Sequence, residues 1–251
     1  MLERLKLINF RCFENHEIEF NDFNVIVGKN DTGKSTIIDA LKLVSNVCRY
    51  ASYRGFYLEE RDIPFSTISL RYNYTEYESV IIANFKNGIE LRVIFPLEER
   101  PYFEFFHFNS PINSKEISKF ISRSSLGVIP PVGTFDETEN PRDKKYISSI
   151  QISYLAPRNF RNIWYYFNDG FQEFQHIIES TWPGYTIKPP EYDLDTNKLY
   201  MLFEEYRFAR EIFWAGHGFQ VWLQLMTSLV KLGNVNSLVL DEPDIYLHSD
   251  M

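Results

Sequence analysis

The spacing of apolar residues predicts strands followed by a helix over the first fifty positions. An extended run begins around Leu5, and residues 16–20 alternate between polar and apolar, which is typical of a half-buried strand. Residues 24–27 form a short β-branched run that predicts a strand buried on both faces. Beyond Lys34 the apolar positions take up helical spacing, at Ile37, Leu41, Val44 and Cys48. A loop therefore leads directly from a strand into a helix.

The middle of the chain has the pattern of an antiparallel β insertion. Residues 67–72, 80–85 and 89–95 are strand-like, and Asn87-Gly88 precedes the last of them. Both residues of that pair tolerate positive φ, so they favour a hairpin turn. Residues 110–145 are rich in Ser, Pro, Asn and charge, which predicts long loops.

The last hundred residues return to α/β patterning. Residues 150–155 predict a strand, residues 161–180 a helix, and residues 237–240 a buried strand. The pattern divides the chain into an N-terminal lobe (1–50), a β-rich insertion with loops (51–146) and a second lobe (147–251).

Composition narrows the class of protein. Of the 251 residues, 44% are hydrophobic and 17% are aromatic, enough for a substantial core. No apolar run approaches the roughly 20 residues needed to cross a bilayer, and the charged N-terminus does not resemble a secretory signal. Two cysteines predict core thiols in a reducing cytoplasm rather than a disulfide framework. Because the net charge is -8, contact with nucleic acid would need a local basic patch.

The first motif with chemistry is a phosphate-binding loop. Gly28-x-x-x-x-Gly33-Lys34-Ser35 matches the P-loop pattern at each required position, between a predicted strand and a predicted helix. Its glycines let backbone N–H groups face phosphate oxygens, and the helix N-terminus adds partial positive charge. Lys34 is the expected phosphate cation and Ser35 an expected Mg²⁺ ligand. The residues expected to bind nucleotide are Gly28, Lys29, Asn30, Asp31, Thr32, Gly33, Lys34, Ser35 and Thr36.

A second motif lies about two hundred residues downstream. Residues 238–240 are apolar and end in Asp241 and Glu242, the arrangement of a Walker B strand. Asp241 is the expected second metal ligand, and Glu242 the expected base for the attacking water. An apolar strand ending in acids is common on its own, so the assignment depends on the P-loop. The long separation argues against a compact GTPase or a small kinase and indicates an ATPase core split by inserted material.

Three segments together resemble a known family. Residues 5–11 (Leu-x-Leu-x-Asn-Phe-Arg), the P-loop and residues 241–248 (Asp-Glu-Pro-Asp-x-x-Leu-His) resemble the ABC-type ATPase heads of the OLD (overcoming lysogenization defect), RecF and SMC-like group, close to bacterial anti-phage ATPases. The resemblance implies an α/β P-loop NTPase fold with an inserted antiparallel β-rich segment. It favours this group over a transporter subunit, and it covers both ends of the chain, with the insertion matched only by position. It also implies that residues 243–248 lie at the interface of two heads.

The same resemblance places a signature loop shortly before Walker B. Residues 214–220 occupy that place, and the resemblance implies that His217, Gly218 and Gln220 contact nucleotide on the opposite subunit. His217 stands where the family has serine; the alternative is a helix-entry turn in which the histidine only caps. No convincing Q-loop glutamine occurs near residues 155–159.

Other polar candidates are weaker. Arg158 and Arg161 are expected either to contact phosphate or a partner subunit, or to lie in a solvated helix start. The run Arg142, Lys144, Lys145 is expected either to contact DNA or to form a solvated loop. The histidines show no metal-ligand spacing, and no Ser/His/Asp arrangement occurs.

The expected function is a cytoplasmic ATPase that uses ATP and Mg²⁺ and works as a homodimer of heads. On the family resemblance it gates a DNA-directed effector in anti-phage defence or DNA processing. The alternative is an ATP-dependent dimerisation or assembly module with little hydrolysis. Because family heads continue past Walker B with a further strand and a histidine loop, the C-terminal part of the core is expected in a longer polypeptide, where a Toprim-type nuclease or a partner protein is the expected effector. The fragment alone is then expected to bind ATP weakly and to hydrolyse it poorly.

Overall fold

The computed structural model describes residues 1–51, 55–113, 116–117, 119–120, 126–151 and 155–242, and these residues form two compact units. Unit 1 consists of Met1–Val128 and Asn234–Val239, and unit 2 of Ile129–Gly233 and Leu240–Met251. Each unit is built around its own hydrophobic core and is described by itself.

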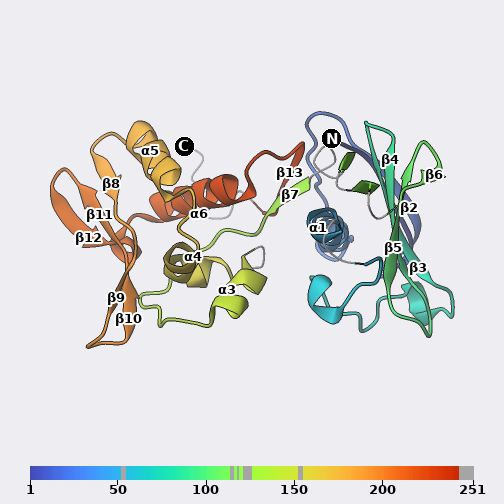
Figure 1. Cartoon of the computed structure of the whole chain (residues 1–251), viewed down its shortest axis with the longest axis horizontal. Helices are drawn as coiled ribbons and strands as arrows, with labels where there is room; N and C mark the ends of the chain where they lie inside the picture. The colour runs from blue at the N-terminus through green and yellow to red at the C-terminus, as the bar shows by residue number, and fades with distance from the viewer. Residues whose placement is uncertain (52–54, 114–115, 118, 121–125, 152–154, 243–251) are drawn as a thin grey trace. The chain divides into compact units, whose positions relative to one another are not determined.

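Unit 1 is an antiparallel sheet covered by one long helix (Figure 1). The sheet has the order β2-β1-β3-β4-β5-β6. Its strands are β1 (Leu2–Phe10), β2 (Phe13–Glu19), β3 (Ser79–Phe85), β4 (Ile89–Phe95), β5 (Tyr102–His107) and β6 (Ser110–Pro111). The strands of the N-terminal lobe and of the β insertion therefore belong to one sheet. The predicted hairpin at Asn87-Gly88 is confirmed: β3 pairs with β4, and Gly88 has φ +77°.

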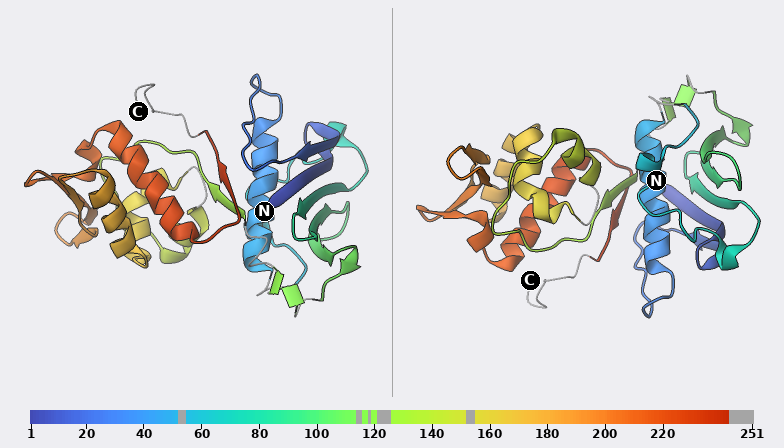
Figure 2. Two further views of the ribbon diagram at one scale, coloured as in Figure 1. Left: turned by 90° about the horizontal axis from the view of Figure 1, so that it is seen from above. Right: turned by 90° about the horizontal axis from the view of Figure 1, so that it is seen from below.

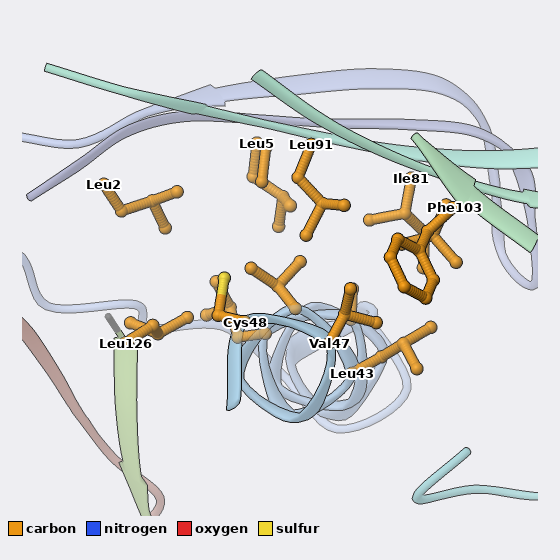
Figure 3. Packing of buried hydrophobic residues seen from close by; sticks show 14 of the residues in the cluster. Leu2, Leu5, Leu43, Val47, Cys48, Ile81, Leu91, Phe103 and Leu126 are labelled. Atoms are coloured by element: carbon orange, nitrogen blue, oxygen red, sulfur yellow. The ribbon is translucent and has the colours of Figure 1, made fainter. Parts of the chain in front are cut away.

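Helix α1 (Lys34–Tyr50) lies on one face of this sheet, as both views in Figure 2 show. Strand β3 is buried at every second residue, so one face of the sheet is apolar and turns toward the helix. Helix residues that the sequence predicted at helical spacing are all buried. In Figure 3, Leu5, Ile81 and Leu91 point from the sheet toward Leu43 and Val47 of the helix. This packing fixes where α1, and therefore the loop before it, begins.

Three predicted strands are corrected. Residues 24–27 form no strand: Val25 and Val27 are exposed, and Asn24 exchanges two side-chain hydrogen bonds with the backbone of Asn21. A β-branched run becomes a strand only when another strand supplies its hydrogen-bond partners, and no described strand does so here.

Residues 67–72 also form no strand. Ser69 has φ +58°, and a 3₁₀ turn, η2 (Tyr72–Tyr74), follows it; η1 (Glu60–Asp62) is a second such turn upstream. Residue 150 ends helix α3 (Lys144–Ile150), and Gln151 and Leu155 lie in turns, so the predicted strand at 150–155 is wrong where it is described; residues 152–154 lie outside the described residues.

Unit 2 packs helices against small sheets at one end. After η3 (Pro157–Asn159), the helices are α4 (Phe160–Tyr166), α5 (Phe171–Thr181) and α6 (His217–Leu232). The single helix predicted for 161–180 is two, because Gly170 takes φ +82° at the start of α5. The short strands are β8 (Tyr185–Ile187), β9 (Glu191–Asp193), β10 (Lys198–Tyr200), β11 (Leu202–Glu205) and β12 (Phe208–Glu211), with η4 (Ile212–Trp214) after them. They form the pairs β9–β10, β8–β11 and β11–β12.

Strands β7 (Leu126–Ile129) and β13 (Ser237–Leu240) pair with each other. The sequence predicted a buried strand at 237–240. The strand is present, but its residues are only partly buried, and Leu238 and Leu240 remain more than two-fifths exposed. The remaining described residues between 110 and 143 are mostly loop, as predicted. No helix among the described residues is long and apolar enough to span a membrane.

Candidate functional site: a phosphate-binding loop and its companions

The P-loop curls around its own lysine. The Nζ of Lys34 donates hydrogen bonds to the carbonyl oxygens of Gly28 (2.6 Å) and Lys29 (2.7 Å). The hydroxyl of Thr32 donates to the same Lys29 oxygen at 2.8 Å. Three side-chain bonds thus close a loop of residues 28–34 and hold one full positive charge at its centre.

Neighbouring side chains lie so close to Gly28 and Gly33 that neither position has room for a Cβ atom. A Cβ on Gly28 would lie 2.7 Å from the Thr32 hydroxyl. Gly33 has φ +94°, a conformation that suits glycine, and a Cβ there would lie 2.5 Å from the ring of Phe13 and 2.9 Å from the Cys12 sulfur. The loop therefore has room only for backbone at these positions, which is what a phosphate cradle needs.

The helix end behind the loop is open to an anion. Gly33 is the N-cap of α1 and supplies no side-chain cap, and the first turn carries no acidic residue. The first N–H groups of a helix have no partner within it and carry partial positive charge. Residues 28–32 and Ser35 are exposed at this end of the helix, whereas Thr36 is buried. This chain's residues therefore fit the triphosphate that the motif implies.

The Asn9-Phe10-Arg11 segment ties the sheet to the helix that follows the loop. Arg11 forms an ion pair with Asp39 of α1 at 2.6 Å and lies over the Phe65 ring at 4.7 Å. The buried side chain of Asn9 accepts from the Tyr72 N–H (3.1 Å) and the Thr75 hydroxyl (2.7 Å). These contacts fix the end of β1 against α1 and the loop at 72–77.

The two Walker B acids follow β13. The Asp241 N–H donates to the Ile129 carbonyl oxygen at 3.2 Å, so the ladder of β7 and β13 extends to the first acid. Glu242 is exposed and has φ +50°, which is strained for a residue with a side chain. Strained backbone of this kind concentrates at functional sites. The related prediction for residues 243–248 lies outside the described residues.

The signature-like loop, residues 214–220, leads into α6. Gly216 is the N-cap, so His217 and Gly218 are the first two helical residues; the histidine is not the cap. The side chain of Gln220 is buried: its Nε2 donates to the carbonyl oxygens of Phe213 (2.8 Å) and Ala215 (2.9 Å), and its Oε1 accepts from the Phe135 N–H (3.0 Å). His217 and Gly218 thus lie in the first turn of α6, while Gln220 holds the loop that leads to it.

Arg161 is neither a phosphate contact nor part of a solvated helix start. It is fully buried and pairs with Glu139 (2.9 Å) and Glu211 (2.7 Å), while Arg158 is exposed. Burial lowers the pKa of the Arg161 guanidinium, but hydrogen bonds and charge from Glu211 and Glu139 outweigh it, so the pKa is raised overall. Burial raises the pKa of the Glu139 carboxyl, and the charge and hydrogen bonds of Arg161 and Asn162 only partly offset this. Nothing in the sequence spacing signals these partners.

The predicted site residues are divided between the two units. Gly28 to Thr36 are brought together in unit 1, and Asp241, Glu242, His217, Gly218 and Gln220 belong to unit 2. Within the part of the chain that the structure describes, no group of three or more His, Cys, Asp or Glu residues forms a metal cluster.

The chain is similar to known ATPases and DNA-processing proteins. A family model described as AAA ATPase domain matches residues 1–185. The chain is 39% identical over 67 residues to an OLD nuclease of Thermus scotoductus (strain ATCC 700910 / SA-01), covering 27% of this chain and 12% of that protein. It is 21% identical over 168 residues to the DNA replication and repair protein RecF of Clostridioides difficile (strain 630), covering 64% of this chain and 39% of that one. The chain thus spans well under half the length of these relatives.

A solved structure shares the fold. The recombination mediator protein RecF with ATP superposes with a TM-score of 0.55 at 12% identity, covering 100% of this chain and 88% of the other. The resemblance inferred from the motifs is thereby confirmed, as is the α/β fold with its β-rich insertion. The chain belongs to the AAA ATPase domain family and is an ABC-type ATPase head of the OLD/RecF/SMC-like group.

Proposed function

We propose that the chain is the ATP-binding and ATP-hydrolysing head of an OLD-like ATPase that gates a DNA-directed effector in anti-phage defence or DNA processing. The observation that carries the proposal is the loop of residues 28–34, which curves around the Lys34 ammonium in front of an uncapped helix. The similar proteins supply the context, since they are an OLD nuclease, a DNA replication and repair protein and a RecF structure with ATP.

The proposed roles follow from the chemistry of each group. Backbone N–H groups of residues 28–36 bind phosphate oxygens, and the Lys34 ammonium exchanges its two carbonyl partners for them. Glu242 accepts a proton from the attacking water. The water oxygen forms a bond to the γ-phosphorus, and the bond from that phosphorus to the β–γ bridging oxygen breaks. Ser35 and Asp241 are the residues proposed to hold Mg²⁺, which neutralises charge on the phosphates.

The proposed assembly is a homodimer of heads in the cytoplasm. His217 and Gly218, the first two residues of α6, contact the nucleotide of the opposite head in this proposal. The similarity to an OLD nuclease makes a nuclease domain or a partner nuclease the proposed effector, with DNA as its target.

A second candidate is an assembly module that binds ATP and dimerises with little hydrolysis. It is favoured by the histidine that stands in place of the signature serine and by the engagement of the Gln220 amide within its own loop. Steady-state phosphate release by the full-length protein, with and without DNA, separates the two candidates. Turnover that DNA stimulates supports the first, and ATP-dependent dimers without turnover support the second.

The ATP-binding part is tested with Lys34→Met, which keeps the length of the side chain and removes its charge. Each charge-assisted contact to phosphate is worth about 1.5–3 kcal/mol, so ATP affinity should fall at least about tenfold. Lys86→Met is the matched control, because Lys86 is a half-exposed lysine of unit 1 that pairs with Asp22 away from the loop. Titration calorimetry of both variants gives the result. Equal ATP affinity in folded Lys34→Met and wild type would exclude the P-loop as the binding site.

A further inference from the structure

A buried ion cluster lies beneath the signature-like loop in unit 2. Arg161 has no exposed side-chain surface, Glu139 has 2% and Glu211 has 14%. The Arg161 Nε and Nη2 donate to the two oxygens of Glu211 at 2.7 and 2.8 Å, a bidentate pair, and its Nη1 donates to Glu139 at 2.9 Å. Every side of the guanidinium is therefore engaged.

Glu211 connects this cluster to the loop. Its Oε2 accepts from the Phe213 N–H at 2.7 Å, which caps the 3₁₀ turn η4, and its Oε1 also accepts from the Met201 N–H at 3.3 Å. Residues 212–214 lead through Ala215 to Gly216, the N-cap of α6. The position of the Phe213 N–H is thus set by a carboxylate whose own position is set by Arg161.

The network closes into a ring through Gln220 and the segment at residues 135–136. Gln220 holds the Phe213 and Ala215 carbonyl oxygens and accepts from the Phe135 N–H. The next residue, Asp136, accepts from the Arg161 Nη1 through its carbonyl oxygen at 3.0 Å. The loop at 213–216 is therefore held from both sides by one connected set of hydrogen bonds.

Energetics indicate what such a ring does. Buried ion pairs are weak contributors to stability, because desolvation consumes most of the Coulomb attraction, and well-packed apolar residues often stabilise a fold as well. Buried charges with fixed partners instead restrict the backbone to one geometry. Here the restricted backbone is the entry to α6, whose N-cap, Gly216, has no side chain to cap the helix.

We propose that Arg161 and Glu211 are positioning residues that hold the signature-like loop, and with it the first turn of α6, in the geometry that receives the γ-phosphate of a nucleotide on the opposite head. This rests on the proposed function. It assigns to Arg161 a role in turnover without contact to nucleotide. Nucleotide affinity at the P-loop is then independent of this pair.

The test compares Glu211→Gln with Glu204→Gln in the full-length protein. Glu211→Gln replaces one acceptor oxygen with an N–H₂ group, so the bidentate pair and the bond from Phe213 are not satisfied together. Glu204→Gln makes the same change one strand earlier, in an exposed pair with Lys188. The proposal expects kcat to fall at least tenfold in the first variant at unchanged ATP affinity, and both values to stay within twofold in the second. A folded Glu211→Gln protein with wild-type kcat overturns the proposal, as does an equal loss in the control.

Hydrogen exchange gives a reading that does not depend on hydrolysis. In the wild-type protein the amides of Phe213 and Ala215 should be strongly protected although they lie outside a long helix or sheet, and Glu211→Gln should lose that protection selectively. Should Glu211→Gln fail to fold, Arg161→Lys keeps the buried charge but not the bidentate geometry, and the same readings apply. Fast exchange of both amides in the wild-type protein overturns the proposal in every case. Protected amides together with absent turnover would instead count against the proposed hydrolysis alone.

Discussion

Gly33→Ala tests the geometry of the phosphate-binding loop through a single methyl group. The residue has φ +94°, and a Cβ would lie 2.5 Å from the Phe13 ring and 2.9 Å from the Cys12 sulfur. A left-handed conformation costs a residue with a side chain about 1–2 kcal/mol. Overpacking at a tight site adds about 1–3 kcal/mol. Phe13 is partly exposed and stacked on His16, so it can turn outward and relieve part of the clash. We expect a total destabilisation of about 2–3 kcal/mol.

Two other glycines separate these contributions. Gly233 has no atom within 4 Å of a built Cβ, but its φ of +63° and ψ of -146° lie near a region that only glycine readily adopts. Gly233→Ala therefore sets an upper limit on the backbone cost without any steric part. Gly55 has open space and no positive φ, so Gly55→Ala should be neutral or stabilising by about 0.4–1 kcal/mol. A Phe13→Ala background should lower the cost of Gly33→Ala by its steric part.

Urea unfolding followed by circular dichroism gives the measurement. All four tryptophans lie between residues 164 and 222, in unit 2, so fluorescence alone would miss the unfolding of unit 1. The expected loss moves the midpoint by about 1 M urea, and ATP affinity should fall with it, because the loop must shift to place the methyl group. The steric argument is refuted if removal of the Phe13 ring recovers none of the stability that Gly33→Ala loses.

Three further predictions concern the carboxylate of Glu242, the buried amide of Asn9 and the ammonium group of Lys231. Glu242→Gln should still bind ATP but hydrolyse it about 10²–10⁴ times more slowly. Near-normal phosphate release would show that another residue acts as the base for the attacking water. Asn9→Ala leaves the Tyr72 N–H and the Thr75 hydroxyl without their acceptor and should cost about 2–4 kcal/mol in urea unfolding; a cost below about 1 kcal/mol would contradict this. Burial lowers the pKa of Lys231 from its usual 10.5 to about 8. Between these pH values the unfolded chain binds more protons than the folded chain, so wild-type stability should rise with pH relative to Lys231→Met. Parallel melting temperatures for the two proteins from pH 7 to pH 10 would show that Lys231 does not titrate in this way.

The elements that depend on neighbouring residues could be predicted from the sequence. The P-loop and helix α1 were predicted because glycine spacing and apolar residues at helical intervals act within a few turns of chain. The hairpin at Asn87-Gly88 was predicted for the same reason, since two residues that tolerate positive φ set the register of their own strands. The two acids after residue 240 were placed at a strand end by their own short apolar run.

Features that depend on residues far away in the sequence became visible only in the folded chain. Residues 24–27 have the composition of a buried strand, but a strand forms only where another offers backbone hydrogen bonds, and a local turn at Asn21 and Asn24 formed instead. Arginine usually lies at the surface. Arg161 is nevertheless buried, because carboxylates 22 and 50 positions away pair with it in the fold. A charge can leave water only when such partners replace its hydration, and their approach is a property of the folded chain that no spacing in the sequence encodes.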